Sequence, residues 1–237
     1  MEYKYSENGN FEDLSSGRVI YGNYGIPNFP VRLLNEIFRR SVSYCERKND
    51  LTIYDPCCGG GYSLTVLGLC NSNISNILGS DIDTKMVDYA RKNTSLLTEK
   101  GLQERVLELE ELLKLFNKTS HRDALDSAKR LDETVNRTID INIFEADCTK
   151  ELCIDSTIDI IITDVPYGAL VEWKGENDNP INNMMEQLHR IANPNTVLAV
   201  SMDKQQKINS PGWNRLERHN IGKRKFEIYK LSVNIDL

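Results

Sequence analysis

Apolar and polar residues alternate between strand-like and helix-like patterns along most of the chain. Helical patterns lie at 62–70 and from Asp83, which suits a helix N-cap, to about Asn93. The almost unbroken isoleucine run at 160–162 is typical of a central strand buried on both faces. Alternating strands and helices predict βαβ units and a mostly parallel sheet, an α/β fold. Short apolar runs predict its strands at 51–55, 77–80, 141–145, 158–163 and 196–202.

The two ends of the chain add elements to this core. Residues 1–48 predict an N-terminal extension with a short strand at 17–22 and a helix whose first turn holds Pro30. Residues 225–233 alternate in polarity, which predicts a last, antiparallel strand at an edge of the sheet. We expect one domain over residues 1–237.

The stretch 99–137 breaks the rhythm because it has no strand pattern. Leu102, Leu109 and Phe116 lie among apolar residues at helical spacing, and residues 120–123 have the pattern of a capping box that opens a second helix. These features predict a helical hairpin inserted before the third strand. The hairpin would serve as a lid or a partner surface, or as a structural buttress on the sheet edge.

Composition is that of an ordinary globular protein, with 40% hydrophobic and 27% charged residues among 237. No apolar run has the length of a membrane span, and the polar N-terminus has no signal-peptide pattern, so we expect a cytoplasmic protein without a membrane partner. The six cysteines form no CxxC pair and have no histidine at ligand spacing, so we expect reduced thiols and no metal site. The net charge of −6 argues against an indiscriminate nucleic-acid binder.

A glycine-rich loop, with Asp55 at its start and three glycines at 59–61, follows the first predicted strand. Glycines let a backbone approach a ligand closely, and the next helix directs its N–H groups at that ligand. The loop matches neither the GxxxxGK[ST] phosphate loop nor the GxGxxG dinucleotide pattern, and it contains no Lys or Arg. A carboxylate opposes a pyrophosphate but suits an amino group and a sulfonium. The loop therefore indicates S-adenosylmethionine.

Two further acidic residues follow the second and third strands. Asp81 lies 20 residues beyond Gly61, where its carboxylate suits both ribose hydroxyls, although a helix-capping role is the alternative. Asp147, followed by Cys148, would accept from the adenine amino group or act as a polar turn residue. The complete predicted cofactor set is Asp55, Cys57, Gly59, Gly61, Asp81, Asp147 and Cys148.

The fourth strand ends in a corner that contains Asp164, Pro166 and Tyr167. The Asp164 carboxylate and the Pro166 carbonyl would accept N–H hydrogens from a flat base, and Tyr167 would supply a stacking face. We expect these three residues to be catalytic. The alternative is an Asp-Pro turn beside a core tyrosine.

With the loop and the corner together, the sequence resembles class I S-adenosylmethionine-dependent N-methyltransferases of nucleic acids. A closer resemblance is to the avilamycin-resistance rRNA methyltransferase family of the AviRa type, which modifies a guanine in large-subunit rRNA. The N-terminal stretch and the helical insertion favour this narrower family. Gly60 stands where relatives commonly have Ser, and Val165 replaces the first proline of the commoner D-P-P-Y.

The resemblance implies a Rossmann-like class I fold and methyl transfer to a guanine base nitrogen in 23S ribosomal RNA. It leaves open whether N1 or N2 is modified and whether resistance is the purpose. One rival function is an N-methyltransferase for a protein glutamine or a small molecule, and another is a non-catalytic scaffold.

Basic residues and tryptophans near the predicted site suggest RNA contacts. Trp173 and Trp213 would stack on unpaired bases or anchor loops to the core. The basic residues after the fifth strand would neutralise phosphates or form a solvated face. They are Lys204, Lys207, Arg215, Arg218, Lys223, Arg224 and Lys225.

Overall fold

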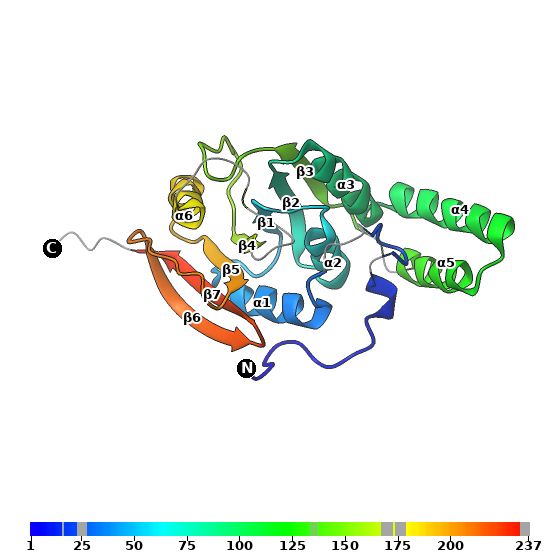
Figure 1. The fold of residues 1–237 in the computed structure, drawn as a ribbon, viewed down its shortest axis with the longest axis horizontal. Coiled ribbons are helices and arrows are strands. Elements are labelled where there is room, and N and C mark those ends of the chain that lie inside the picture. The colour runs from blue at the N-terminus through cyan, green and yellow to red at the C-terminus, as the bar shows by residue number, and fades with distance from the viewer. Residues whose placement is uncertain are drawn as a thin grey trace.

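The computed structural model describes residues 1–15, 17–22, 28–133, 135, 137–166, 173 and 179–232. Within these residues, seven strands form one sheet in the order β3-β2-β1-β4-β5-β7-β6 (Figure 1). The strands are β1 (Leu51–Asp55), β2 (Ile74–Asp81), β3 (Asp140–Glu145), β4 (Ile160–Asp164), β5 (Val197–Asp203), β6 (Trp213–Ile221) and β7 (Arg224–Leu231). The first five pair in parallel, and β7 pairs antiparallel to both β5 and β6. The predicted mostly parallel sheet is confirmed.

Helices cover both faces of this sheet. They are α1 (Val31–Tyr44), α2 (Tyr62–Cys70), α3 (Thr84–Thr94), α4 (Glu99–Phe116), α5 (Thr119–Asp132) and α6 (Pro180–Ile191), with short 3₁₀ turns at Glu12–Leu14 (η1) and Ser95–Leu97 (η2). In β4, Ile160 and Ile162 pack into the apolar cluster that holds α1, α2 and α3. Ile161 points the other way, into the cluster that holds α6. The isoleucine run is therefore buried on both faces, as predicted. Among the described residues, no helix is both long and apolar enough to cross a bilayer.

Two predicted elements differ from the structure. Residues 17–22 form turns and bends, so the predicted short strand there is wrong. The C-terminal strand β7 is antiparallel, as predicted, but it lies second from the edge, and β6 is the edge strand. The pattern of β6 conceals it, because most of its side chains are exposed and polar and show no apolar face to the sequence.

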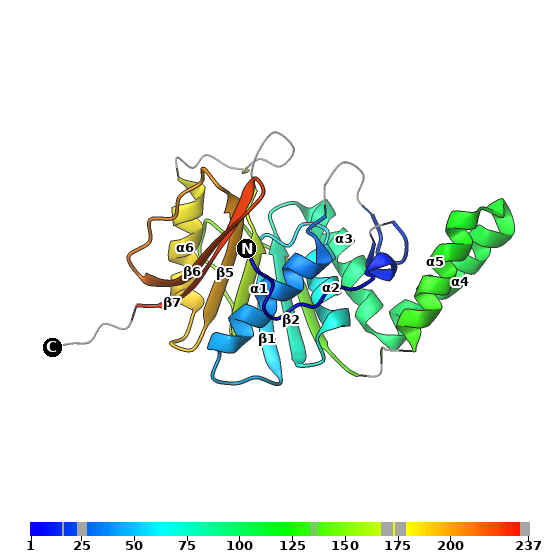
Figure 2. The ribbon, with the colours of Figure 1, turned by 90° about the horizontal axis from the view of Figure 1, so that it is seen from below.

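The predicted helical hairpin is present as α4 and α5, which project from the body of the protein beyond α3 (Figures 1 and 2). Helix α5 begins at Thr119 after Lys118, whose side chain makes no capping bond, so the predicted capping box at 120–123 is wrong. At the outer end of the hairpin, Leu115 and Phe116 are 74% and 56% exposed. The hairpin thus packs chiefly on itself and on elements near its base.

Tyr21 ties the base of the hairpin to the sheet domain. Its hydroxyl donates to Glu108 Oε2 of α4 at 2.8 Å, and its backbone N–H donates to Asn93 Oδ1 of α3 at 2.8 Å. Arg105 of α4 also donates to the Val19 carbonyl oxygen at 3.0 Å. The N-terminal extension therefore joins the base of the hairpin to α3.

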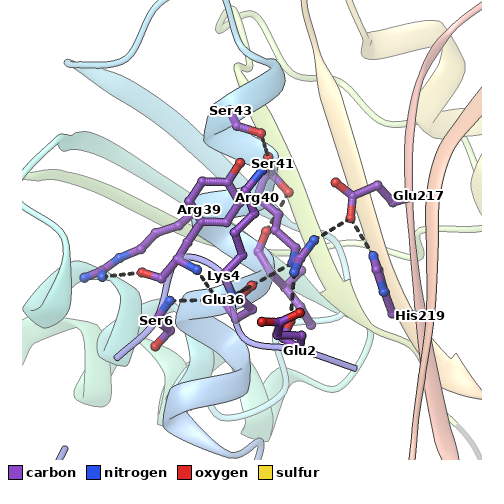
Figure 3. Close-up of polar contacts among 12 residues, drawn as sticks. Glu2, Lys4, Ser6, Glu36, Arg39, Arg40, Ser41, Ser43, Glu217 and His219 are labelled. Atoms are coloured by element: carbon purple, nitrogen blue, oxygen red, sulfur yellow. Dashed lines mark hydrogen bonds and ion pairs between the residues drawn. The ribbon is translucent and has the colours of Figure 1, made fainter. Parts of the chain in front are cut away.

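A buried carboxylate fastens the first residues of the chain onto α1 (Figure 3). Glu36 is completely buried, and its two oxygens accept from the backbone N–H groups of Lys4, Tyr5 and Ser6 at 2.7 to 2.8 Å. Arg40 Nε donates to the same carboxylate at 2.7 Å. Burial acts to raise the pKa of Glu36, but these four donors hold that pKa below its usual value.

Arg40 extends this cluster to the edge of the sheet. Its Nη1 atom lies 2.9 Å from Glu217 Oε2 on β6, and the Tyr44 hydroxyl donates to Glu217 Oε1 at 2.7 Å. The His219 ring contacts the same carboxylate (Figure 3). The N-terminus, α1 and the edge strand are thus held by one polar cluster.

We expect the Glu36→Gln substitution to lower the free energy of unfolding by about 3 kcal/mol, because it leaves Arg40 and backbone donors without their buried charge. Urea denaturation followed by circular dichroism measures this change. Glu7→Gln, at an exposed position of the same segment, is the control. Equal midpoints for the two variants would contradict this role for Glu36.

Candidate active site at the carboxyl ends of the strands

The glycine loop between β1 and α2 adopts a backbone that only glycine takes easily. Gly59 and Gly61 have φ of +50° and +76°, and Gly61 is the N-cap of α2. A Cβ atom on Gly61 would lie 2.8 Å from Ala90 Cα, so α3 also requires glycine there. Glycine is therefore required at 59 and 61 by the backbone of the loop and, at 61, by the packing of α3. The close approach of this loop to a ligand stays a prediction.

Asp81, at the end of β2, holds this loop in place. Its Oδ2 atom accepts from the Gly59 N–H and its Oδ1 atom from the Asp83 N–H, both at 2.9 Å. Asp83 itself caps α3 by accepting from the Lys85 N–H, as the sequence predicted. Asp81 is therefore no helix cap, and it lies beside the glycine loop, as a ribose ligand would have to.

Asn93 is a second anchor of the loop, and sequence reasoning missed it. Its Nδ2 group donates to the Gly60 carbonyl oxygen at 2.8 Å and to the Tyr21 carbonyl oxygen at 3.1 Å. A buried asparagine inside a helical pattern gives no sequence signal, because its partners come from two distant segments. The loop is consequently held from β2 and from α3.

Asp147 and Cys148 follow β3 and lie next to the loop. Cys148 Sγ is 3.5 Å from Cys57 Sγ, and this neighbouring thiol together with burial raises the pKa of Cys57. Asp147 Oδ1 accepts from the Thr149 N–H and hydroxyl, and its Oδ2 atom pairs with Lys150 at 3.2 Å. Asp147 thus acts as a turn residue in this structure. The turn follows β3, at the same edge of the sheet as the glycine loop.

Asp55 is the most deeply buried carboxyl group of the site, at 4% exposure. Its Oδ1 atom accepts from the Cys57 N–H at 3.0 Å. Burial raises the pKa of Asp55 to about 7, and the negative charges of Asp81 and Asp164 act in the same direction. Asp55 and Asp164 line one pocket together with Phe29.

The corner after β4 holds two hydrogen-bond acceptors. Asp164 Oδ2 pairs with Arg224 Nη1 of β7 at 2.9 Å, and the Pro166 carbonyl accepts from Gln206 Nε2 at 3.1 Å. Burial raises the pKa of Asp164 to about 6, while the Arg224 charge opposes this rise. Tyr167, the third residue predicted at this corner, lies outside the described residues.

The structure revises the predicted RNA contacts. Trp213 is buried and donates from Nε1 to the Met185 carbonyl oxygen at 3.0 Å, so it anchors β6 to α6 and does not stack on bases. Trp173 is half-buried against the same core. Among the basic residues, Arg224 pairs with Asp164, and buried Lys225 pairs with Glu227 at 3.0 Å. Buried Lys225 therefore lies outside the predicted basic surface, and the charge of partly buried Arg224 is compensated within the protein.

The charge of the site matches the cofactor that the sequence indicates. Asp55, Asp81 and Asp164 gather at the ends of neighbouring strands, and burial keeps the pKa values of two of them raised. A ligand with an ammonium and a sulfonium would compensate this negative charge, whereas a pyrophosphate would be repelled. The residues therefore fit S-adenosylmethionine. No group of three or more potential metal ligands occurs among the described residues.

Comparison with known proteins agrees with this geometry. The family model described as rRNA methyltransferase AviRa matches residues 1–224. A 23S rRNA (guanine(2535)-N(1))-methyltransferase of Streptomyces viridochromogenes is 35% identical over 224 residues, which cover 90% of this chain and 88% of the relative.

Solved structures show the same relationship. The rRNA methyltransferase aviRa from Streptomyces viridochromogenes matches with a TM-score of 0.86 and 32% identity over 94% of both chains. TrmN from Thermus thermophilus shares the fold alone, with a TM-score of 0.51 and 12% identity over 86% of this chain and 49% of that one. The family resemblance inferred from the loop, the corner and the insertion is confirmed. The protein belongs to the AviRa family of rRNA methyltransferases.

Proposed function

We propose that this protein transfers a methyl group from S-adenosylmethionine to ring nitrogen N1 of a guanine in 23S ribosomal RNA. The observation that carries the proposal is the pair of fixed acceptors, the Asp164 carboxylate and the Pro166 carbonyl, beside a glycine loop rich in negative charge. The N1 assignment follows the name of the Streptomyces viridochromogenes relative.

Two acceptors at one corner favour guanine over adenine. The Watson–Crick edge of guanine presents the N1–H and N2–H donors side by side. Adenine presents one donor and the N1 lone pair, and that lone pair would oppose an acceptor oxygen. Tyr167 would stack on the base, which must leave its own stack to reach the corner.

The cofactor would lie along the glycine loop. In this arrangement Asp55, Gly59 and Gly61 border its methionine end, Asp81 accepts from the ribose hydroxyls, and Cys57, Asp147 and Cys148 border the adenine. When bound, S-adenosylmethionine supplies an electrophilic methyl group. The protein contributes mainly alignment, since methyl transfer is a single in-line displacement.

Methylation replaces the guanine N1–H bond with an N1–CH₃ bond, so the N1 proton must leave. Asp164 is suited to accept it, because burial raises its pKa to about 6 and Arg224 keeps a negative charge there favourable. Below that pH the carboxyl group is protonated and loses this capacity. We place the reaction in the cytoplasm, where ribosomal RNA is the substrate.

The function is tested by supplying labelled S-adenosylmethionine and 23S rRNA to the purified protein. We expect label in the RNA and, in mass maps of nuclease digests, one methylated guanosine. Primer extension then stops at that nucleotide, because an N1 methyl group blocks the Watson–Crick edge. Label in a protein fraction alone would overturn the proposal.

We expect Asp164→Asn to lower kcat about 100-fold while the affinity for S-adenosylmethionine stays near wild type, because the variant loses an acceptor that acts on the base. Methylation kinetics and calorimetry measure the two quantities. Asp155→Asn, an exposed position before the same strand, is the control. Equal losses of turnover and cofactor affinity would assign Asp164 to support of the fold.

We expect Asp81→Asn to weaken S-adenosylmethionine binding about tenfold or more, because a carboxylate that holds the loop and accepts from the ribose is replaced by a weaker acceptor. Calorimetry with S-adenosylmethionine and with its demethylated product measures this. Asp88→Asn, exposed on α3, keeps wild-type affinity. Unchanged affinity in Asp81→Asn would remove Asp81 from the cofactor site.

A further inference from the structure

The two acceptors after β4 are each held by a side chain from outside the glycine loop and the corner itself. Arg224 Nη1 lies 2.9 Å from Asp164 Oδ2, and Gln206 Nε2 lies 3.1 Å from the Pro166 carbonyl oxygen. We propose that Arg224 and Gln206 are positioning residues, which fix these two acceptors in advance for the guanine edge. This inference rests on the proposed function.

Arg224 reaches its partner across an intervening strand. Strand β5 lies between β4 and β7 in the sheet (Figure 1). Arg224 opposes Asp203 in the β5–β7 pair and Asp164 opposes Ser201 in the β4–β5 pair, so the ion pair crosses β5. The Arg224 Cζ atom also lies 5.3 Å from the centre of the Phe29 ring, which is buried. An arginine stacked on an aromatic face and paired with a carboxylate has little rotational freedom.

The ion pair leaves the other carboxylate oxygen available. Asp164 Oδ1 is shielded from solvent and has no hydrogen-bond partner of normal geometry within the described part of the chain. The Ser201 side chain lies near the carboxyl group and lowers its pKa. A buried acceptor without a partner is costly, so it suits a donor that arrives with the substrate. The pocket beside it is lined by Phe29, Asp55 and Ser201, among others. Arg224 thus fixes one oxygen and presents the second.

Gln206 fixes the second acceptor, the Pro166 carbonyl oxygen. Its Oε1 atom accepts from the Asp203 N–H at 2.9 Å, which orients the amide so that Nε2 faces Pro166. A carbonyl oxygen has two lone pairs, so one stays available for the base. The Val165 N–H also donates to the Ser201 carbonyl oxygen at 3.0 Å. Three contacts from β5, its following turn and β7 therefore immobilise the corner.

Immobilised acceptors matter because transition-state stabilisation depends on groups that need not reorganise during the reaction. Arg224 has a second effect through its charge. Among the described residues, the charged groups that face the Asp164 carboxyl are Arg224 from β7 and Asp55 from β1, with the neutral Ser201 from β5. Removal of the Arg224 charge therefore raises the pKa of Asp164 from its present value of about 6.

The test compares Arg224→Met, Arg224→Lys and Gln206→Ala with the wild-type protein on 23S rRNA. We expect Arg224→Met to lower kcat about tenfold and to move the acidic limb of its pH profile up by about one pH unit. Arg224→Lys keeps the acidic limb at its wild-type pH, because the substituted side chain keeps the positive charge beside Asp164. Gln206→Ala lowers kcat without moving the limb, and KM for RNA and the affinity for S-adenosylmethionine stay near wild type in each variant.

Two controls and a second readout make the result decisive. Gln205→Ala and Arg190→Met remove an exposed amide and an exposed, ion-paired arginine, and both keep wild-type kinetics. Carbon-13 NMR titration of the Asp164 carboxyl, assigned through Asp164→Asn, reports the same rise in pKa without substrate or cofactor.

An unmoved Asp164 titration in Arg224→Met, or wild-type kcat in Gln206→Ala, overturns the inference while wild-type methylation of the RNA stands. Failure of the wild-type protein to methylate the RNA instead refutes the proposed function, and the NMR titration still decides whether Arg224 sets the charge of Asp164.

Discussion

The structure depends on the burial of carboxylates where the parallel strands end. Asp55 and Asp164 have raised pKa values because the sheet and α1 remove water from them, and Asp81 adds further negative charge nearby. Within the described residues, Arg224 pairs with one of these groups and backbone N–H groups bind the others. Such an edge is unfavourable by itself, and a cationic donor together with the N–H groups of a base would compensate it. The buried carboxyl groups thus lower the stability of the fold at the edge where the cofactor and the base would bind.

The surrounding fold supplies the rigidity that this edge needs. Glu36 fastens the first residues onto α1, and α1 in turn carries apolar side chains against β4 and β5. Phe29, which precedes the N-cap Pro30 of that helix, lines the pocket and lies against Arg224. The N-terminal extension is consequently part of the pocket wall. Of its two predicted elements, the helix after Pro30 forms as α1 and the strand at 17–22 does not form.

Prediction from sequence succeeded where the signal is local or periodic. The five parallel strands and the hairpin follow from the spacing of apolar residues. The glycine loop follows from three successive glycines, since only glycine takes its positive φ angles easily. Asp83 as a helix cap is equally local. Prediction failed where partners come from distant segments. Asn93, Gln206 and Arg224 look ordinary in the sequence. They gain their roles only when α3 lies beside the glycine loop and when β4, β5 and β7 lie next to one another. The edge strand β6 was missed because its exposed, charged side chains mask the period of two.

The contacts of Tyr21 divide the hairpin into two parts. Glu108, halfway along α4, bonds to Tyr21, which bonds to Asn93, which holds the Gly60 carbonyl. The inner half of the hairpin is therefore connected to the glycine loop by hydrogen bonds, whereas apolar residues at the outer end are exposed to solvent. An engineer who trims this family to a minimal scaffold must cut beyond Glu108, and the outer turns are where a tag or a fused module can be inserted with least disturbance to the reaction centre.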